Sequence, residues 1–296
     1  MSWGTAVAAV AALLSLLSLD ERWLGELGRW RGELVRWRNL YEERDPSFGI
    51  SLAFDIEGTL EDVTSPYQRI QVLQTAAFGK ILLIDDDLML TERDEGSYHE
   101  MMAHVPLNYM PDAEAVLIVG GGDGGVCMQA LRHPNVRRVV VVDIDEMVVE
   151  VSRRHFPKLA ACYDSPRVTL LHEDAADWAS AAVQRGDVFD AVLVDSTDFG
   201  TSDPLHTSDF YATLRQLARG GKGAVVINLT SLSWNLGGAQ EIAHMHAALY
   251  THVAVYQVFQ PTYASLVLPT TPQHTLAAGT CCALLPPVGL AVCGAL

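Results

Sequence analysis

The stretch VLIVGGGDGGV (Val116–Val126) decides the fold, because an apolar run passes directly into a loop of five glycines and one aspartate. Four apolar residues in succession are typical of a strand that is buried on both faces. The glycines satisfy the nucleotide-binding pattern GxGxxG at Gly120, Gly122 and Gly125. Such loops usually approach a phosphate or another anion, so the carboxylate of Asp123 leaves open which ligand this loop accepts.

The segments after this loop predict a mainly parallel sheet with helices on both faces. Further apolar strands are expected at Arg138–Val142, Val168–His172, Ala191–Val194 and Ala224–Asn228. Amphipathic patterns such as DEMVVEVSRRHF and HTSDFYATLRQLARG lie between these strands and predict helices. The alternation of apolar strands with helices indicates an α/β domain.

Changes in residue pattern and composition divide the chain into four segments. They are a helical extension at 1–47, a small β domain at 48–108, the α/β domain at 109–265 and a low-complexity tail at 266–296. Short alternating runs between Phe48 and Leu90 predict antiparallel strands, with turns at Gly58, Ser65-Pro66 and Phe78-Gly79. The tail has no clear period, and at most one irregular strand is expected in it.

The N-terminal extension combines an apolar run with an amphipathic pattern. Ala6–Leu19 is apolar over fourteen residues, which is short for a membrane span of roughly 20. Trp23, Trp30 and Trp37 then fall on one face of a helix. We expect this helix to pack on its own domain or on a sister subunit, with a partner helix or a membrane surface as the alternatives. A leader at residues 1–20 is also left open.

Composition narrows the classes of partner. The 296 residues are 49% hydrophobic and 19% charged, which is typical of a globular protein. A formal net charge of −16 argues against nucleic acid and favours a cationic small substrate, although many soluble proteins are acidic. The five cysteines form no CxxC pair, which predicts a reducing compartment. We therefore expect a cytoplasmic protein.

Carboxylates follow several of the predicted strands. Asp143 ends the second strand, Asp174 follows the third, and Asp195 and Asp198 follow the fourth. The loops after parallel strands meet at one edge of the sheet, so these groups and Asp123 are expected in one crevice. Like charges this close raise each other's pKa unless cations fill the crevice.

A metal ion or a cationic ligand would relieve this crowding. The histidine pairs His99 with His104 and His244 with His246 lack a third ligand at a recognisable spacing, and HEMMAH has one residue too many for a zinc helix. We therefore expect no metal and no prosthetic group. A nucleoside together with an amine substrate fits the carboxylates better.

Several blocks carry a resemblance to a known family. SPYQRIQV, TERDEGSYHEMMAHVPL, VLIVGGGDGGV, VVDIDEMVVEVSRRHFP, VDSTD and QPTY resemble, in order, the polyamine aminopropyltransferases, the spermidine synthase family. The resemblance runs from about Ser65 to Tyr263. It implies a Rossmann-like S-adenosylmethionine-dependent transferase fold with a small N-terminal antiparallel β domain, and a homodimer. The implied reaction moves the aminopropyl group of decarboxylated S-adenosylmethionine onto putrescine or another polyamine and releases methylthioadenosine.

The resemblance also assigns roles to particular residues. Asp195 would take a proton from the attacking amine, aided by Tyr98. Asp123 would hold the ammonium end of the aminopropyl chain, since the donor has lost its carboxylate. Binding of the donor would further involve Gln68, Gly120, Gly122, Gly125, Asp143, Asp174 and Ala175. The acceptor would be held by Asp198 and Tyr263, with a nearby polar role for His99.

The chain departs from the family pattern near the acceptor side of the site. Phe199 stands where the family has proline, VINLTSLSW lacks an acidic residue near Ser231, and the resemblance ends after Tyr263. These departures leave the choice of acceptor open. The alternatives are a thermospermine or spermine synthase, an S-adenosylmethionine-dependent putrescine N-methyltransferase, and a relative that binds these ligands without catalysis.

Overall fold

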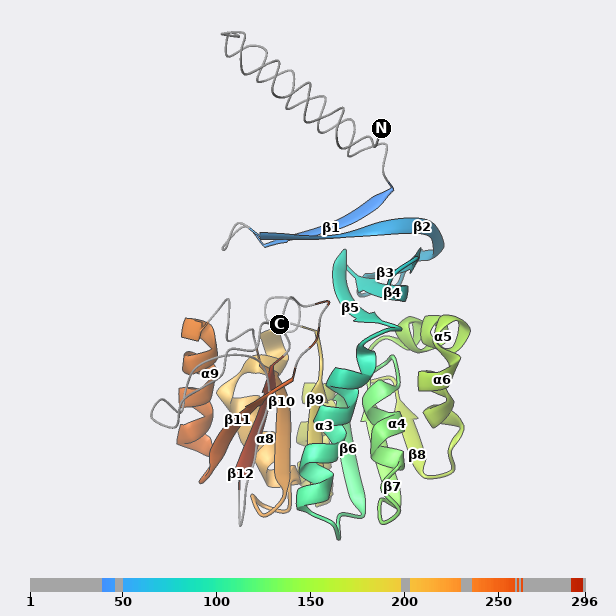
Figure 1. Ribbon diagram of the computed structural model, residues 1–296. Coiled ribbons are helices and arrows are strands. Elements are labelled where there is room, and N and C mark those ends of the chain that lie inside the picture. The colour runs from blue at the N-terminus through green and yellow to red at the C-terminus, as the bar shows by residue number, and fades with distance from the viewer. Residues whose placement is uncertain are drawn as a thin grey trace, which may run out of the picture.

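The computed structural model describes residues 39–45, 50–197, 203–229, 236–258, 260, 262 and 289–294. They form a small antiparallel sheet and a larger parallel sheet flanked by helices, with the small sheet beyond one end of the α/β domain (Figure 1). The predicted fold class, a Rossmann-like domain after a β domain, is confirmed. In the part of the chain that is described, no helix has both the length and the apolar content to cross a membrane.

The small sheet is a meander in which each strand pairs with the next. Its strands are β1 (Leu40–Asp45), β2 (Ile50–Thr64), β3 (Arg69–Thr75), β4 (Gly79–Ile84) and β5 (Asp87–Thr91). The predicted helical extension therefore ends too late at 47, because Leu40–Asp45 pairs with β2 as a strand. The remaining residues of that extension that are not in β1 lie outside the described residues, apart from Asn39. Pairing with β2 and a ring contact between Tyr41 and Phe54 hold β1 in place.

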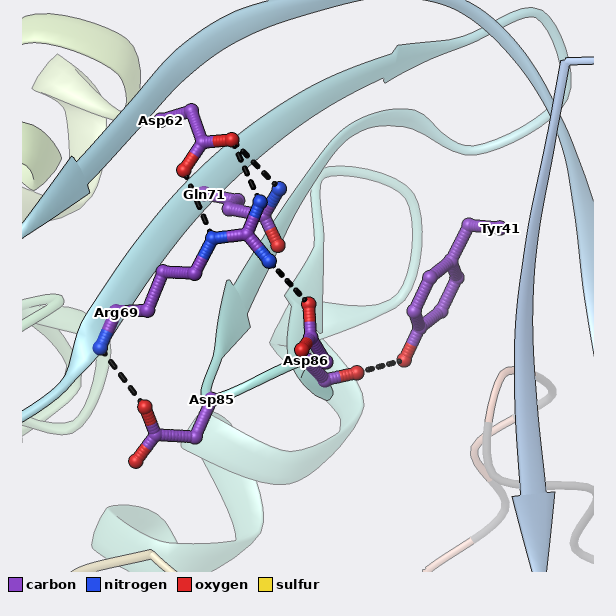
Figure 2. Close-up of polar contacts among 6 residues, drawn as sticks. All are labelled: Tyr41, Asp62, Arg69, Gln71, Asp85 and Asp86. Carbon is purple, nitrogen blue, oxygen red and sulfur yellow. Dashed lines mark hydrogen bonds and ion pairs between the residues drawn. The ribbon is translucent and has the colours of Figure 1, made fainter.

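One corner of the small sheet is held by Arg69. Its guanidinium group makes two hydrogen bonds of 2.9 and 2.7 Å to Asp62 and a third of 2.8 Å to Asp86, as Figure 2 shows. Its backbone N–H donates to Asp85 at 2.8 Å. Asp85 and Asp86 form the tight turn between β4 and β5, and both have positive φ. These contacts fix the start of β3, and therefore also the preceding residue Gln68, which faces the α/β domain.

The larger sheet has seven strands in the order β11-β12-β10-β9-β6-β7-β8, and neighbouring strands run parallel. The strands are β6 (Ala115–Gly120), β7 (Arg138–Val142), β8 (Val168–Leu171), β9 (Ala191–Asp195), β10 (Ala224–Leu229), β11 (Val253–Gln257) and β12 (Gly289–Gly294). The expected strands of the α/β domain are thus confirmed. The sequence placed residues 266–296 outside this domain, but Gly289–Gly294 inserts between β10 and β11 and belongs to the sheet.

Two helical layers cover the sheet, and alternate residues of each strand point to opposite layers. On one face Val116 and Ile118 pack with α3 (Glu95–Tyr109) and α4 (Gly125–Leu131). On the other face Leu117 and Val119 pack with α7 (Ala175–Arg185), α8 (Ser208–Leu217) and α9 (Leu236–Leu249). The remaining helical elements are α5 (Glu146–His155), α6 (Pro157–Ala160), η1 (Ala161–Asp164) and η2 (Asp203–His206).

The two sheets are joined by a shared apolar cluster. Ile70 and Leu82 of the small sheet pack against Val148 and Val151 of α5. The chain also passes from β5 almost directly into α3, which runs along the larger sheet (Figure 1). Residues from the small sheet, α3 and the strand ends of the larger sheet can therefore meet in one place.

Candidate active site

The glycine loop after β6 lies against the end of β9. Gly120 has φ of +76°, and a Cβ atom there would lie 2.2 Å from the carbonyl oxygen of Asp195. The same oxygen accepts a hydrogen bond of 2.8 Å from the backbone N–H of Gly121. Only glycine fits at position 120, because any side chain would push the loop off the strand that carries Asp195.

His99 of α3 fills the space beside the helix that starts at Gly125. A Cβ atom on Gly125 would lie 2.2 Å from the His99 ring, which is only 2% exposed. Nδ1 of His99 lies 2.6 Å from a carboxylate oxygen of Glu95, and Nε2 lies 3.4 Å from one of Asp123. The ring is therefore clamped between two carboxylates.

This arrangement gives His99 and Asp123 opposite charges. Burial acts to lower the pKa of His99, but the charge of Asp123 and hydrogen bonds to Asp123 and Glu95 raise it well above its usual range. Burial acts to raise the pKa of Asp123, but the His99 charge and the backbone N–H of Gly125 leave it below its usual value. An imidazolium on α3 thus compensates the carboxylate of the glycine loop from within the protein. The sequence predicted only a nearby polar role for His99.

Asp195 lies at the end of β9, where Tyr98 reaches it from α3. The Tyr98 hydroxyl donates a hydrogen bond of 2.8 Å to Oδ1 of Asp195. Oδ2 is buried and has no hydrogen-bond partner among the described residues. Burial and the charge of Asp123 raise the pKa of Asp195 to about 7, against the opposing effect of His99 and Tyr98. A carboxylate with one free oxygen and a pKa near neutrality is suited to accept a proton.

Asp143 directly follows β7, the neighbour of β6, and faces the glycine loop. A Cβ atom on Gly122 would lie 2.8 Å from Oδ2 of Asp143. The other oxygen of Asp143 accepts a hydrogen bond of 2.9 Å from the backbone N–H of Asp145. Burial raises the pKa of Asp143 to about 6, although backbone donors oppose this effect. Asp123, Asp143 and Asp195 therefore lie close enough to interact electrostatically, as the sequence predicted for these three of the five carboxylates.

Asp174 lies further along the same edge and caps α7. Its side chain accepts hydrogen bonds of 2.8 and 3.0 Å from the backbone N–H groups of Ala176 and Asp177. Asp174 is exposed, whereas Ala175 is buried. The exposed carboxylate keeps one oxygen that these two bonds do not use, so it can meet a ligand at the edge of the sheet.

Gln68 directly precedes β3 of the small sheet, and its side chain hydrogen-bonds to another residue of the protein. Its side-chain amide donates a hydrogen bond of 2.9 Å to Asp145, which also accepts one of 2.6 Å from the Ser65 hydroxyl. Asp145 is 1% exposed and caps α5. Asp145 thus ties the small sheet to the loop after β7, two residues beyond Asp143.

Sequence reasoning missed several residues that complete this site. Glu95 could have been found from its spacing of four residues before His99 on a predicted helix. Ile144 lies between Asp143 and Asp145 and is 38% exposed. An exposed apolar side chain beside Asp143 is a surface on which an aromatic ligand ring could pack. An apolar residue between two aspartates in the sequence is a weak signal of such a surface.

Two predicted acceptor residues, Asp198 and Tyr263, lie outside the described residues. The same holds for Phe199 and Ser231, where the chain departs from the family pattern. The described part of the site therefore comprises the residues that the sequence predicts for donor binding and for proton transfer. Roles on the acceptor side stay predictions.

One side-chain cluster has the composition of a metal site. Within the described residues, His99, Asp123 and Asp195 bring possible ligand atoms within 4.8 Å of one another. Each ring nitrogen of His99 is directed at a carboxylate, and these contacts raise the pKa of His99, which favours the protonated ring without a lone pair for a metal. The cluster in this arrangement fits an internal ion pair rather than a metal centre, and His104 contacts His133 instead of His99.

A parallel sheet with a glycine loop and carboxylates at its strand ends is typical of Rossmann-like folds that bind nucleotides or nucleosides. Comparison with known proteins identifies the family. Residues 95–277 match the spermine/spermidine synthase domain, and residues 40–92 match the spermidine synthase tetramerisation domain. The chain belongs to the spermidine synthase family, the polyamine aminopropyltransferases.

Individual relatives support this assignment. The chain is 35% identical over 226 residues to polyamine aminopropyltransferase 1 of Aquifex aeolicus, which covers 76% of this chain and 79% of that protein. It is 37% identical over 227 residues to spermidine synthase 1 of Pisum sativum, covering 76% of this chain and 64% of that protein.

Solved structures show the same fold. A spermidine synthase in complex with the transition-state analogue AdoDATO superposes with a TM-score of 0.71 at 27% identity, covering 76% of each chain. The spermidine synthase from Thermotoga maritima gives a TM-score of 0.70, also at 27% identity and with 76% of each chain covered.

Proposed function

We propose that this enzyme transfers the aminopropyl group of decarboxylated S-adenosylmethionine to putrescine and forms spermidine and methylthioadenosine. The observation that carries this proposal is the Asp195 carboxylate, with its raised pKa and unpaired Oδ2, beside the glycine loop. Membership of the aminopropyltransferase family supports the same reaction.

The reaction forms a C–N bond and breaks a C–S bond, and it moves one proton from nitrogen to a carboxylate oxygen. The lone pair of the putrescine nitrogen attacks the aminopropyl carbon next to sulfur, and the electron pair of the C–S bond moves to the sulfonium sulfur. The thioether product, methylthioadenosine, is uncharged at sulfur. The proton lost from the amine goes to Oδ2 of Asp195, while Tyr98 holds Oδ1 in place. Because the sulfonium already is a good leaving group, orientation and charge account for most of the catalysis.

The charges around the glycine loop favour a decarboxylated donor. Asp123, Asp195 and Glu95 face a single imidazolium, His99. A donor that brings an ammonium group without a carboxylate balances this excess of negative charge, whereas intact S-adenosylmethionine adds another anion. In this proposal Asp143 and Asp174 bind the nucleoside, with Gln68 and Ala175 beside it, and Asp123 meets the ammonium group.

The small sheet supports an oligomeric form of the enzyme. Residues 40–92 match a tetramerisation domain, so we propose that this sheet takes part in a homo-oligomer. The homodimer predicted from the sequence and a tetramer differ twofold in mass. Light scattering on the full-length protein distinguishes them, and a monomer at working concentration would contradict the proposal.

The pH dependence follows from the sign of the Asp195 shift. Burial and Asp123 raise the pKa of Asp195 to about 7, so the free enzyme loses its base by protonation as the pH falls through 7. We expect kcat/KM for putrescine to fall about tenfold per pH unit well below this pKa. Initial rates from pH 5.5 to 9 at low putrescine test this, and a profile flat down to pH 5.5 would contradict the role of Asp195.

The choice of acceptor is tested with a panel of amines of increasing length. Purified enzyme is incubated with decarboxylated S-adenosylmethionine and either putrescine, cadaverine, spermidine or spermine, and the products are identified by mass spectrometry. The proposal expects the highest kcat/KM with putrescine. A preference for spermidine would instead assign the enzyme to the spermine or thermospermine synthases.

A further inference from the structure

Asp94 stands at the start of α3 but does not cap its own helix. An aspartate at this position commonly accepts hydrogen bonds from the first backbone N–H groups of the helix. Here the Asp94 side chain makes no such bond. It is 7% exposed and directs its two oxygens to residues outside the helix. Its position is therefore set by contacts to other parts of the fold.

Those contacts join two distant segments. Oδ1 of Asp94 accepts a hydrogen bond of 2.7 Å from the hydroxyl of Thr91, at the end of β5. Oδ2 accepts two bonds from Thr262, one of 3.0 Å from the backbone N–H and one of 2.7 Å from the hydroxyl. Thr91 and Thr262 are 0% and 1% exposed. The Asp94 carboxylate thus accepts hydrogen bonds from both the backbone N–H and the hydroxyl of Thr262, which lies 168 positions further along the chain.

A second bond fastens the same C-terminal segment to α3. The hydroxyl of Tyr256, on β11, donates a hydrogen bond of 2.5 Å to the backbone carbonyl of Met101. β11 is therefore attached to α3 at Met101, and Thr262, five residues beyond β11, is attached at Asp94. Tyr98, which contacts the proton acceptor Asp195, lies on α3 between these two attachment points.

We propose that Asp94 is a positioning residue that sets the acceptor side of the site relative to Tyr98 and Asp195. Thr262 directly precedes Tyr263, and Asp94 precedes Tyr98 by four residues, about one helical turn. The bonds from Asp94 therefore hold the residue directly before Tyr263 in the chain. This inference rests on the proposed function, in which Tyr263 contacts the amine. It adds Asp94 as the residue that positions the chain for that contact.

The chain offers a matched pair of substitutions. Thr262→Val and Thr91→Val each remove one buried hydroxyl donor from the same carboxylate and keep the side-chain volume nearly constant. Thr262→Val still leaves Oδ2 its bond from the Thr262 backbone N–H, whereas Thr91→Val removes the Thr91 bond from Oδ1. A role in stability alone would therefore affect Thr91→Val at least as strongly. A positioning role toward the amine affects only Thr262→Val. Thr262→Ser restores the hydroxyl and serves as the rescue variant.

Putrescine binding in the presence of methylthioadenosine, measured by titration calorimetry, gives the first readout. We expect Thr262→Val to weaken putrescine binding about tenfold, as for a lost hydrogen bond to a charged group, while Thr91→Val and Thr262→Ser remain within about twofold of the unmodified protein. Methylthioadenosine affinity should be the same in all variants. The same split is expected in steady-state kinetics, as a raised KM for putrescine with a smaller change in kcat.

Equal putrescine affinity in Thr262→Val and Thr91→Val would overturn the inference. If Thr262→Val does not fold, Thr262→Ala provides the same test, since it also removes the hydroxyl and keeps the backbone N–H bond. Because binding is measured separately from turnover, the two proposals fail in different ways. An unmodified protein that binds putrescine without aminopropyl transfer contradicts the proposed function, whereas the comparison of variants still decides the role of Asp94. Absence of putrescine binding by the unmodified protein would overturn both.

Discussion

Replacing Asp195 by Asn should lower kcat for aminopropyl transfer by about 10² to 10⁴-fold, the usual contribution of a general base. The amide keeps the shape of the side chain and can still accept the hydrogen bond from Tyr98, so the geometry of the site should survive. It cannot take up the proton of the amine. Steady-state rates with saturating decarboxylated S-adenosylmethionine and putrescine measure the effect.

The stability of this variant provides an independent check. Burial and Asp123 raise the pKa of Asp195 to about 7. The protonated side chain therefore stabilises the folded state relative to the unfolded chain at low pH, and this contribution is lost as the pH rises through 7. Asp195→Asn removes this unfavourable buried charge, and its melting temperature at pH 8 should equal or exceed that of the unmodified enzyme. Asp209→Asn, on the exposed start of α8, serves as the control with unchanged kcat. An Asp195→Asn variant with full activity would remove the proposed base.

The second large effect is expected from Gly120→Ala. Alanine at φ of +76° is strained, and its Cβ atom would lie 2.2 Å from the carbonyl oxygen of Asp195. The glycine loop must then move away from β9, which breaks the hydrogen bond from Gly121 to the same oxygen. We expect a loss of about 3 kcal/mol or more in the free energy of unfolding, together with loss of methylthioadenosine binding. Urea denaturation and titration calorimetry measure the two quantities.

Gly186→Ala is the matched control for this substitution. Gly186 has φ of +78°, close to that of Gly120, but a Cβ atom there would meet nothing within 4 Å. Gly186→Ala shares the backbone strain of Gly120→Ala but lacks the collision. It should therefore lower the free energy of unfolding by about 1 kcal/mol and leave nucleoside binding intact. Equal losses for both variants would show that strain alone, and not the contact with β9, makes Gly120 necessary.

The fold was predictable where the pattern of apolar residues is strong. Val139–Val142 and Val192–Val194 are continuous apolar runs buried on both faces, and they are strands. Gly58 was predicted as a turn but lies within β2, next to an irregularity in its pairing with β3. A glycine in a strand marks a bulge as readily as a turn. Gly289–Gly294 was not predicted as part of the sheet, because its place depends on long-range pairing with β10 and β11.

The candidate site was predictable to the extent that topology gathers strand ends. Asp123, Asp143 and Asp195 meet because each lies at or just beyond the end of a strand of one parallel sheet. The partners of these groups were less accessible to sequence reasoning. His99 lies 24 residues before Asp123, and Thr262 lies 168 residues after Asp94. No local pattern indicates which buried carboxylate such residues will contact, since this depends on how α3 packs on the sheet.

The most direct test compares two donors with one acceptor. Purified enzyme is given putrescine with decarboxylated S-adenosylmethionine in one reaction and with intact S-adenosylmethionine in another, and the products are identified by mass spectrometry. The proposed function requires spermidine and methylthioadenosine in the first reaction and no methylated diamine in the second. N-methylputrescine in the second reaction, without spermidine in the first, would contradict it and assign the chain to methyl transfer. Methylthioadenosine binding with no product from either donor would contradict it as well and leave a protein that binds the nucleoside without catalysis.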